Sequence, residues 1–71
     1  MKIVKIISDW FEINTSDFTE DTLLSEFIKD DVDLALLIEM VESEFGVVAE
    51  DSVAESWKTL ADIIGFIDDE S

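Results

Sequence analysis

Apolar residues recur at helical spacing in three separate stretches of this 71-residue chain, and that periodicity limits what the chain can fold into. Strict alternation of apolar and polar residues, the pattern of a half-buried strand, is sustained nowhere, and proline is absent. The spacing therefore predicts an all-α fold, with a first helix over about residues 2–12. Its inward stripe comprises Ile3, Ile6, Ile7 and Trp10, widened by Val4 and Phe11.

The second stripe predicts a helix over about residues 31–44. Asp30 or Asp31 is expected to cap it, because a short carboxylate accepts hydrogen bonds from the first N–H groups and suits the positive end of the helix dipole. Gly46 is expected to end it, because glycine readily adopts the left-handed conformation of a C-terminal cap. The inward face would comprise Leu34, Leu37, Ile38, Val41 and Phe45.

The third stripe predicts a last helix that begins at Thr59. Thr59 and Asp62 resemble a capping box, and Gly65 would mark a close helix contact, because glycine is otherwise unfavourable there. Before this helix, residues 50–57 predict a short helix or a single turn, capped by Asp51. The stripe of the last helix comprises Leu60, Ile63, Ile64 and Ile67.

The remaining segments are predicted to lack helices. A long polar loop follows the first helix, and isolated apolar residues would anchor it to the core: Phe18, Leu23, Leu24 and Phe27. Residues 68–71, "DDES", would form a solvated tail. We therefore expect a single domain, residues 1–71, built as a four-helix bundle with three longer helices, one short helix and a long first loop.

The charge balance limits the partners of the chain. Nineteen acidic residues face four lysines, which gives a net charge of −15. Nucleic acids and anionic membrane surfaces would repel this chain, so neither is expected as a partner, whereas a basic protein surface would attract it. No segment approaches the roughly 18 consecutive apolar residues of a membrane span, and the start lacks a signal-peptide cleavage site. We expect a cytoplasmic monomer.

The residue types present exclude most catalytic chemistry. Histidine and cysteine, the commonest general bases, nucleophiles and soft metal ligands, are absent, and no glycine-rich loop could hold a nucleotide. Asp31 and Asp33 match the first two ligands of a calcium loop, but Leu36 stands where that loop needs glycine. We therefore expect no catalytic residue, no specific metal site and no enzymatic activity.

The order of these elements, together with four local motifs, resembles the acyl carrier protein family. That family opens its second helix with Asp-Ser-Leu and ends this acidic, apolar-striped helix near Glu-Glu-Phe. An acidic short helix follows, and the last helix opens with threonine and an apolar residue. The resemblance runs without gaps from Val4 to Ile67 and implies an acyl-carrier-like four-helix bundle. The matching segments are Asp30-Asp31-Val32, Glu42-Ser43-Glu44-Phe45, Glu50-Asp51 with Ala54, and Thr59-Leu60.

The resemblance implies a departure at the residue on which the family's chemistry depends. In that family a phosphopantetheinyl transferase joins 4'-phosphopantetheine to the motif serine, and acyl chains ride on the terminal thiol of this arm. The matching position here is Asp31, with Asp30 and Val32 as its motif neighbours, and a carboxylate cannot accept the arm in that linkage. No serine lies between Ser25 and Ser43. We therefore expect no cofactor on the chain as written, and 4'-phosphopantetheine only if position 31 were serine.

Two interpretations of Asp31 remain open. It would keep the negative charge that a modified serine places at the start of the helix, or it would serve only as the N-cap.

The resemblance also implies docking and acyl-binding residues. Acidic residues of the second helix would meet basic patches on carrier-dependent biosynthetic enzymes, synthases and transferases, although Leu36 replaces a position that is often acidic in the family. These docking residues are Asp33, Glu39, Glu42 and Glu44, with an ordinary solvated face as the alternative. An acyl pocket would be lined by Phe27, Leu37, Val41, Ile63 and Ile67, with ordinary core packing as the alternative.

These features favour one function and leave two alternatives. The favoured function is an acyl carrier protein homologue of fatty-acid, polyketide or peptide biosynthesis that docks partner enzymes but cannot take phosphopantetheine at Asp31. The first alternative is a true acyl or peptidyl carrier whose attachment serine is replaced by Asp31 in this chain. The second is an acidic helical adaptor or inhibitor that uses the fold only as a charged docking surface.

Overall fold

Helices account for all the regular structure of the computed structural model, which describes residues 2–70. Within that range there is no strand, only an isolated antiparallel bridge between Leu23 and Thr59. The all-α prediction is confirmed, and the three longer helices lie where the apolar stripes predict them. The elements are α1 (Lys2–Phe11), the 3-10 helix η1 (Leu24–Glu26), α2 (Asp31–Phe45), α3 (Asp51–Ala54) and α4 (Leu60–Glu70).

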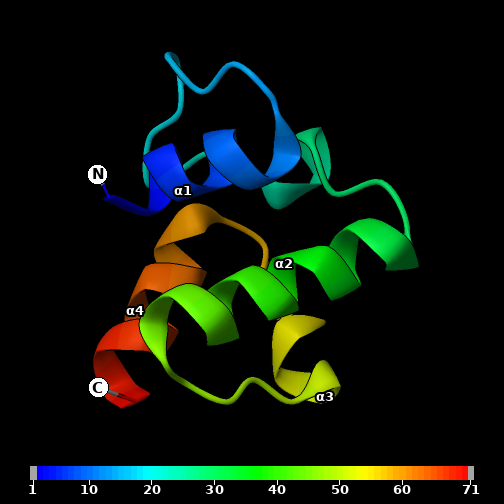
Figure 1. The fold of residues 1–71 in the computed structure, drawn as a ribbon, viewed down its shortest axis with the longest axis vertical. Coiled ribbons are helices and arrows are strands. Elements are labelled where there is room, and N and C mark those ends of the chain that lie inside the picture. Colours follow the sequence, from blue (N-terminus) through cyan, green and yellow to red (C-terminus); the bar gives the residue numbers. More distant parts are fainter. Residues whose placement is uncertain (1, 71) are drawn as a thin grey trace.

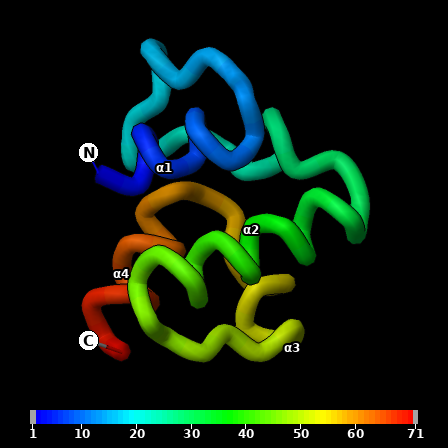
Figure 2. Tube along the Cα trace, in the orientation of Figure 1, coloured from blue at the N-terminus to red at the C-terminus, as the bar shows by residue number. Residues whose placement is uncertain are grey.

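The longest helix, α2, crosses the molecule, with α1 on one side and α3 on the other (Figure 1). The start of α1 and the end of α4 lie toward the end of the molecule where α2 finishes. The chain between α1 and α2 makes a long excursion over α1 before it descends into α2 (Figure 2). No helix in the described part of the chain is both long and apolar enough to cross a membrane.

The core is wholly apolar, and no described side chain that is polar or charged is buried. The predicted stripes supply most of it, but the stripe prediction for the second helix missed Met40, which is fully buried. Trp57 lies between α3 and α4 and packs on Phe66, with 5.4 Å between the ring centroids. The buried residues are Ile3, Ile6, Ile7, Leu24, Leu37, Met40, Val41, Val47, Ala49, Ala54, Trp57, Leu60 and Ile63.

The first loop is tied to the start of α4 through its backbone. The N–H of Leu24 donates to the carbonyl of Lys58 at 2.9 Å, and the N–H of Ala61 donates to the carbonyl of Glu20 at 2.9 Å. The second bond satisfies an N–H in the first turn of α4, which has no partner within the helix. Of the predicted anchors, Leu24 is buried, whereas the Leu23 side chain is 51% exposed, so the prediction for Leu23 is wrong.

The other two predicted anchors of the loop are aromatic. Phe27 packs against Phe11 of α1 and against Phe18, with 5.4 Å and 5.5 Å between the ring centroids. All three rings are half-buried against the core, so an aromatic cluster holds the long excursion onto α1.

The two glycines play different parts. Gly46 has φ 67°, in the left-handed region, and its N–H donates to the carbonyl of Glu42 at 3.0 Å, so the predicted end of α2 is confirmed. Gly65 does not mark a close helix contact, because a Cβ added there would meet nothing within 4 Å. That prediction was wrong because a glycine in a helix does not by itself reveal a neighbour.

The predicted caps of the last two helices are corrected in part. Asp51 is the first residue of α3, not its cap, because the extended residue before the helix is Glu50, whose side chain makes no capping bond. At α4 the Asp62 carboxylate accepts hydrogen bonds from the N–H groups of Lys58 at 2.8 Å and Thr59 at 3.1 Å. These bonds hold the pKa of Asp62 below its ordinary value.

The predicted tail is also corrected. α4 continues to Glu70, so Asp68 and Asp69 are exposed but helical. Ser71 lies outside the described residues. The acidic composition of this segment favoured a solvated coil, but three consecutive acidic side chains point in different directions around a helix, so they are compatible with one.

Candidate functional site

The start of α2 is held by two aspartates, neither of which is Asp31. Asp30 is the N-cap: its backbone is extended, and its Oδ1 accepts a hydrogen bond from the N–H of Asp33 at 2.9 Å. The Oδ2 of Asp33 in turn accepts from the N–H of Lys29 at 2.9 Å. Together these two bonds satisfy N–H groups on both sides of the helix start.

Asp31 is the first residue inside α2 and contributes nothing to this cap. It is exposed, and its side chain makes no hydrogen bond with any described residue. Of the two residues expected to cap the helix, Asp30 is therefore confirmed and Asp31 is not the cap, because a cap needs the extended backbone that Asp30 has. The Asp31 carboxylate is left at the positive end of the helix, beside Val32, whose side chain is 76% exposed.

Asp31 also stands at the edge of a hollow of about 290 Å³ between α2 and α3. Its floor is apolar and comes from α2, and its edge carries three carboxylates and no basic residue. The sequence did not single out Asp51 and Glu55 for this place, because only packing brings α3 against the first turns of α2. The lining residues are Asp31, Leu34, Ala35, Ile38, Asp51 and Glu55.

Two comparisons with known proteins point to one family. The family described as "Phosphopantetheine attachment site" matches residues 2–67. An acyl carrier protein of Lactobacillus acidophilus is 36% identical over 67 residues, which cover 93% of this chain and 84% of that protein. The chain belongs to the acyl carrier protein family. Acyl carrier proteins of Thermotoga maritima, 35% identical over 94% of this chain and 84% of the relative, and of Clostridium perfringens, 31% identical over 93% and 88%, are further relatives.

The prosthetic group that gives the family its description needs a hydroxyl, and the start of α2 has none. Asp31, Val32 and Asp33 fill the first turn. Ser25 lies before this turn in η1, and Ser43 lies near the far end of α2. The residues present therefore do not fit a phosphodiester-linked arm at this helix start.

Three of the four acidic residues that the family resemblance marked for docking make hydrogen bonds inside the chain. Asp33 is part of the helix start, as described above. The Oε2 of Glu42 accepts from the N–H of Ala49 at 2.9 Å and holds the segment between α2 and α3. The Oε1 of Glu44 accepts from the Trp10 indole N–H at 3.1 Å, across the contact between α1 and α2. Glu39 is exposed and makes no such bond with a described residue.

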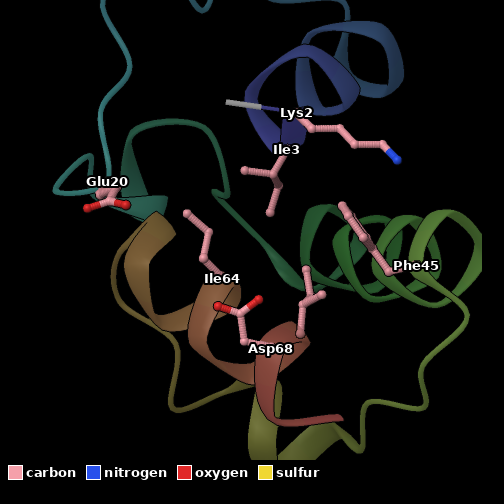
Figure 3. Close-up of a pocket in the computed structure, with 7 residues that line it drawn as sticks. Lys2, Ile3, Glu20, Phe45, Ile64 and Asp68 are labelled. Atoms are coloured by element: carbon pink, nitrogen blue, oxygen red, sulfur yellow. The ribbon is translucent and has the colours of Figure 1, made fainter. Parts of the chain in front are cut away.

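The residues expected to line an acyl pocket are not gathered around one cavity. Leu37, Val41 and Ile63 are fully buried core residues, and Phe27 belongs to the aromatic cluster of the first loop. Ile67 alone of these residues lines a described hollow. Phe45, the last residue of α2, lines the same hollow (Figure 3), which therefore lies at the far end of α2 from Asp31. Acyl binding by this set thus stays a prediction, and in the present conformation its members pack as core.

Proposed function

We propose that this chain is a carrier-like docking protein: it binds the basic surfaces of carrier-dependent biosynthetic enzymes but carries no phosphopantetheine and catalyses no reaction. The observation that supports this most directly is Asp31, an exposed carboxylate with no role in the helix cap, at a helix start that offers no hydroxyl. Membership of the acyl carrier protein family supports the kind of partner.

The physical basis for docking is charge at the start of α2. Asp31, Asp51 and Glu55 surround an apolar floor, and Glu39 is exposed further along the helix. On a chain of net charge −15 these groups would steer a basic surface toward this face, and the apolar floor would add contact area once the surfaces meet. A carboxylate at position 31 retains negative charge where the family's modified serine would carry a phosphodiester.

The loading test is intact-mass spectrometry after incubation with coenzyme A and a promiscuous phosphopantetheinyl transferase. We expect no mass gain on the chain as given and a gain of one arm on Asp31→Ser. Asp31→Ala is the matched control that removes the carboxylate without supplying a hydroxyl. Because Asp31 is not the cap, Asp31→Ser should fold normally, and circular dichroism would check this. If Asp31→Ser gains nothing, the fold is not a substrate for this transferase and the adaptor function is favoured.

A gain on the chain as given would contradict the proposal. Ser52 would then be the first residue to replace by alanine, because it is exposed in the first turn of α3 and follows Asp51.

The docking test is competition with a loaded acyl carrier protein for a ketosynthase. The chain as given should compete, and Asp31→Lys and Glu39→Lys should each weaken the competition. Glu26→Lys makes the same charge change as Glu39→Lys on η1, away from this face, and should have a smaller effect. Equal loss in all three variants would mean that only net charge matters.

A further inference from the structure

One side of α2 carries an apolar side chain that the core does not use. Leu36 is half-buried but does not pack against the core, whereas every other half-buried apolar residue in the described part of the chain does. Leu34, two residues earlier and therefore on the opposite side of the helix, is one of those that pack. Core packing thus accounts for the apolar residues on one side of α2 and leaves Leu36 unexplained.

Leu36 belongs to an exposed apolar stripe. Val32 lies one turn before it on the same face of α2, and the Val32 side chain is 76% exposed. Ala35, which is also exposed, lies beside both and lines the hollow between α2 and α3. We call Val32, Ala35 and Leu36 the outer stripe. Isolated exposed apolar residues are common on proteins, but adjoining ones form a patch whose burial against a partner is favourable.

Carboxylates without partners border the outer stripe. Asp31 lies in the first turn of α2, and Glu39 follows Leu36 by three residues on the same face. Both are exposed, and neither makes a hydrogen bond or an ion pair with a described residue. Lys29, the lysine closest to them in sequence, donates its ammonium to the carbonyl of Ser25 at 2.8 Å. The charge beside the stripe is therefore negative and is not paired with a cation of the described chain.

We propose that the outer stripe docks an apolar patch of a partner protein that is bordered by lysines or arginines, and that Leu36 is the residue that selects this patch. The partner's basic groups would meet Asp31 and Glu39, while its apolar side chains would cover Val32 and Leu36. Charge argues against two other coverings of this face, because a second copy of the chain also carries −15 and an anionic membrane would repel it. The inference rests on the proposed function for the class of partner and deepens it by naming the contact surface.

A capped helical peptide of two Leu-Ala-Arg-Leu-Ala-Ala-Arg repeats presents such a patch, and NMR titration at about 150 mM salt would locate its binding surface. We expect the largest shifts at the methyl groups of Val32, Ala35 and Leu36. The matched peptide with alanine in place of every leucine keeps the charge and the helix propensity, and it should bind at least about fivefold more weakly. Equal binding of the two peptides, or largest shifts outside α2, would overturn the proposal.

Matched variants separate the outer stripe from general attraction. Leu36→Ala should weaken binding of the leucine peptide at least about threefold, because it removes apolar contact area. Leu23→Ala makes the same change at a side chain that is 51% exposed outside α2, and it should lose less than half as much. Val32→Ala and Val48→Ala form a second pair, since these side chains are 76% and 75% exposed. Equal losses within either pair would contradict the proposal.

A stability measurement distinguishes a contact residue from a structural one. Leu36→Ala should leave the urea midpoint unchanged or raise it, because the side chain does not pack against the core and alanine favours a helix. A loss as large as that of Leu37→Ala, which removes a fully buried leucine, would make Leu36 structural and overturn the proposal. So would sedimentation that shows a dimer of the chain as given and a monomer of Leu36→Ala.

The peptide readouts involve neither an arm nor a ketosynthase, so the two proposals can fail separately. Selective binding of the leucine peptide at Leu36, without competition for the ketosynthase, would support the outer stripe and contradict the proposed function. Competition for the ketosynthase with equal binding of the two peptides would support the proposed function and contradict the outer stripe.

Discussion

At the scale of single residues, neighbouring carboxylates at the start of α2 make different contacts. Asp30 and Asp33 accept backbone hydrogen bonds at the start of α2, while Asp31 between them accepts none from the described residues. The division follows from position: the extended residue before the helix accepts from the N–H groups of its first turn, and the third helical residue reaches back to an N–H before the helix, whereas the first helical residue does neither. Replacing the Asp31 side chain is therefore expected to leave the fold intact.

Asp30→Ala is expected to lower the free energy of unfolding by about 1 kcal/mol, the usual cost of losing a side-chain cap. Asp31→Ala is the matched control and should cost less than Asp30→Ala, since it loses only an exposed charge at the helix dipole. Urea unfolding followed by circular dichroism measures both. A larger loss for Asp31→Ala would show that the cap is assigned to the wrong residue.

Asp62 should contribute to stability in a pH-dependent way. Its pKa is lowered in the folded state by the N–H groups of Lys58 and Thr59, so its contribution is present above the ordinary value of 3.8 and is lost as the pH falls through the lowered folded pKa. Asp62→Asn should therefore be less stable than the parent at neutral pH, and the difference should shrink in acid below 3.8. Thermal unfolding of both proteins across that range checks this, and a constant difference would contradict it.

At the scale of elements, the position of a glycine in a helix decides whether replacing it would stabilise or destabilise the fold. The left-handed conformation of Gly46 ends α2, whereas Gly65 sits in the helical middle of α4 with open space around it. The same residue type is required at one place and unfavourable at the other.

Gly65→Ala is expected to raise the free energy of unfolding by about 1 kcal/mol, because alanine favours the helix and its Cβ meets nothing. Gly46→Ala makes the same change where φ is positive and should lower stability by about 1–2 kcal/mol. Opposite shifts in the urea midpoint are the expected result. A loss on Gly65→Ala would mean that α4 needs flexibility at this residue.

The elements themselves could be predicted because helical periodicity is local. The stripes of α1, α2 and α4 were sufficient to place three helices, and Gly46 was sufficient to end one of them. What the sequence left open or missed depended on single-residue backbone conformation, as with Asp30 against Asp31, or on partners distant in sequence. The backbone N–H of Ala49 donates to Glu42, and the indole N–H of Trp10 donates to Glu44. Neither pairing can be predicted from the spacing of apolar residues in α2.

At the scale of the whole molecule, a net charge of −15 destabilises the folded state through repulsion among the acidic groups. Added NaCl or Mg²⁺ should therefore raise the melting temperature by screening this repulsion. The double variant Glu26→Lys/Glu39→Lys, which exchanges two exposed acids for lysines, should melt higher at low salt and respond less to added salt. Thermal melts at low and high ionic strength measure this, and an unchanged or lower melting temperature in salt would contradict it.

The two tryptophans lie at separate places in the fold, so the intrinsic fluorescence of each can report on its own surroundings. Trp10 lies at the contact between α1 and α2 with its indole N–H on Glu44, whereas Trp57 is 8% exposed beside Phe66. Fluorescence from a Trp57→Phe variant would therefore come only from the α1–α2 contact, and that from Trp10→Phe only from the junction between α3 and α4. A partner that binds near either tryptophan would shift the emission wavelength of that tryptophan, without any label attached to the protein.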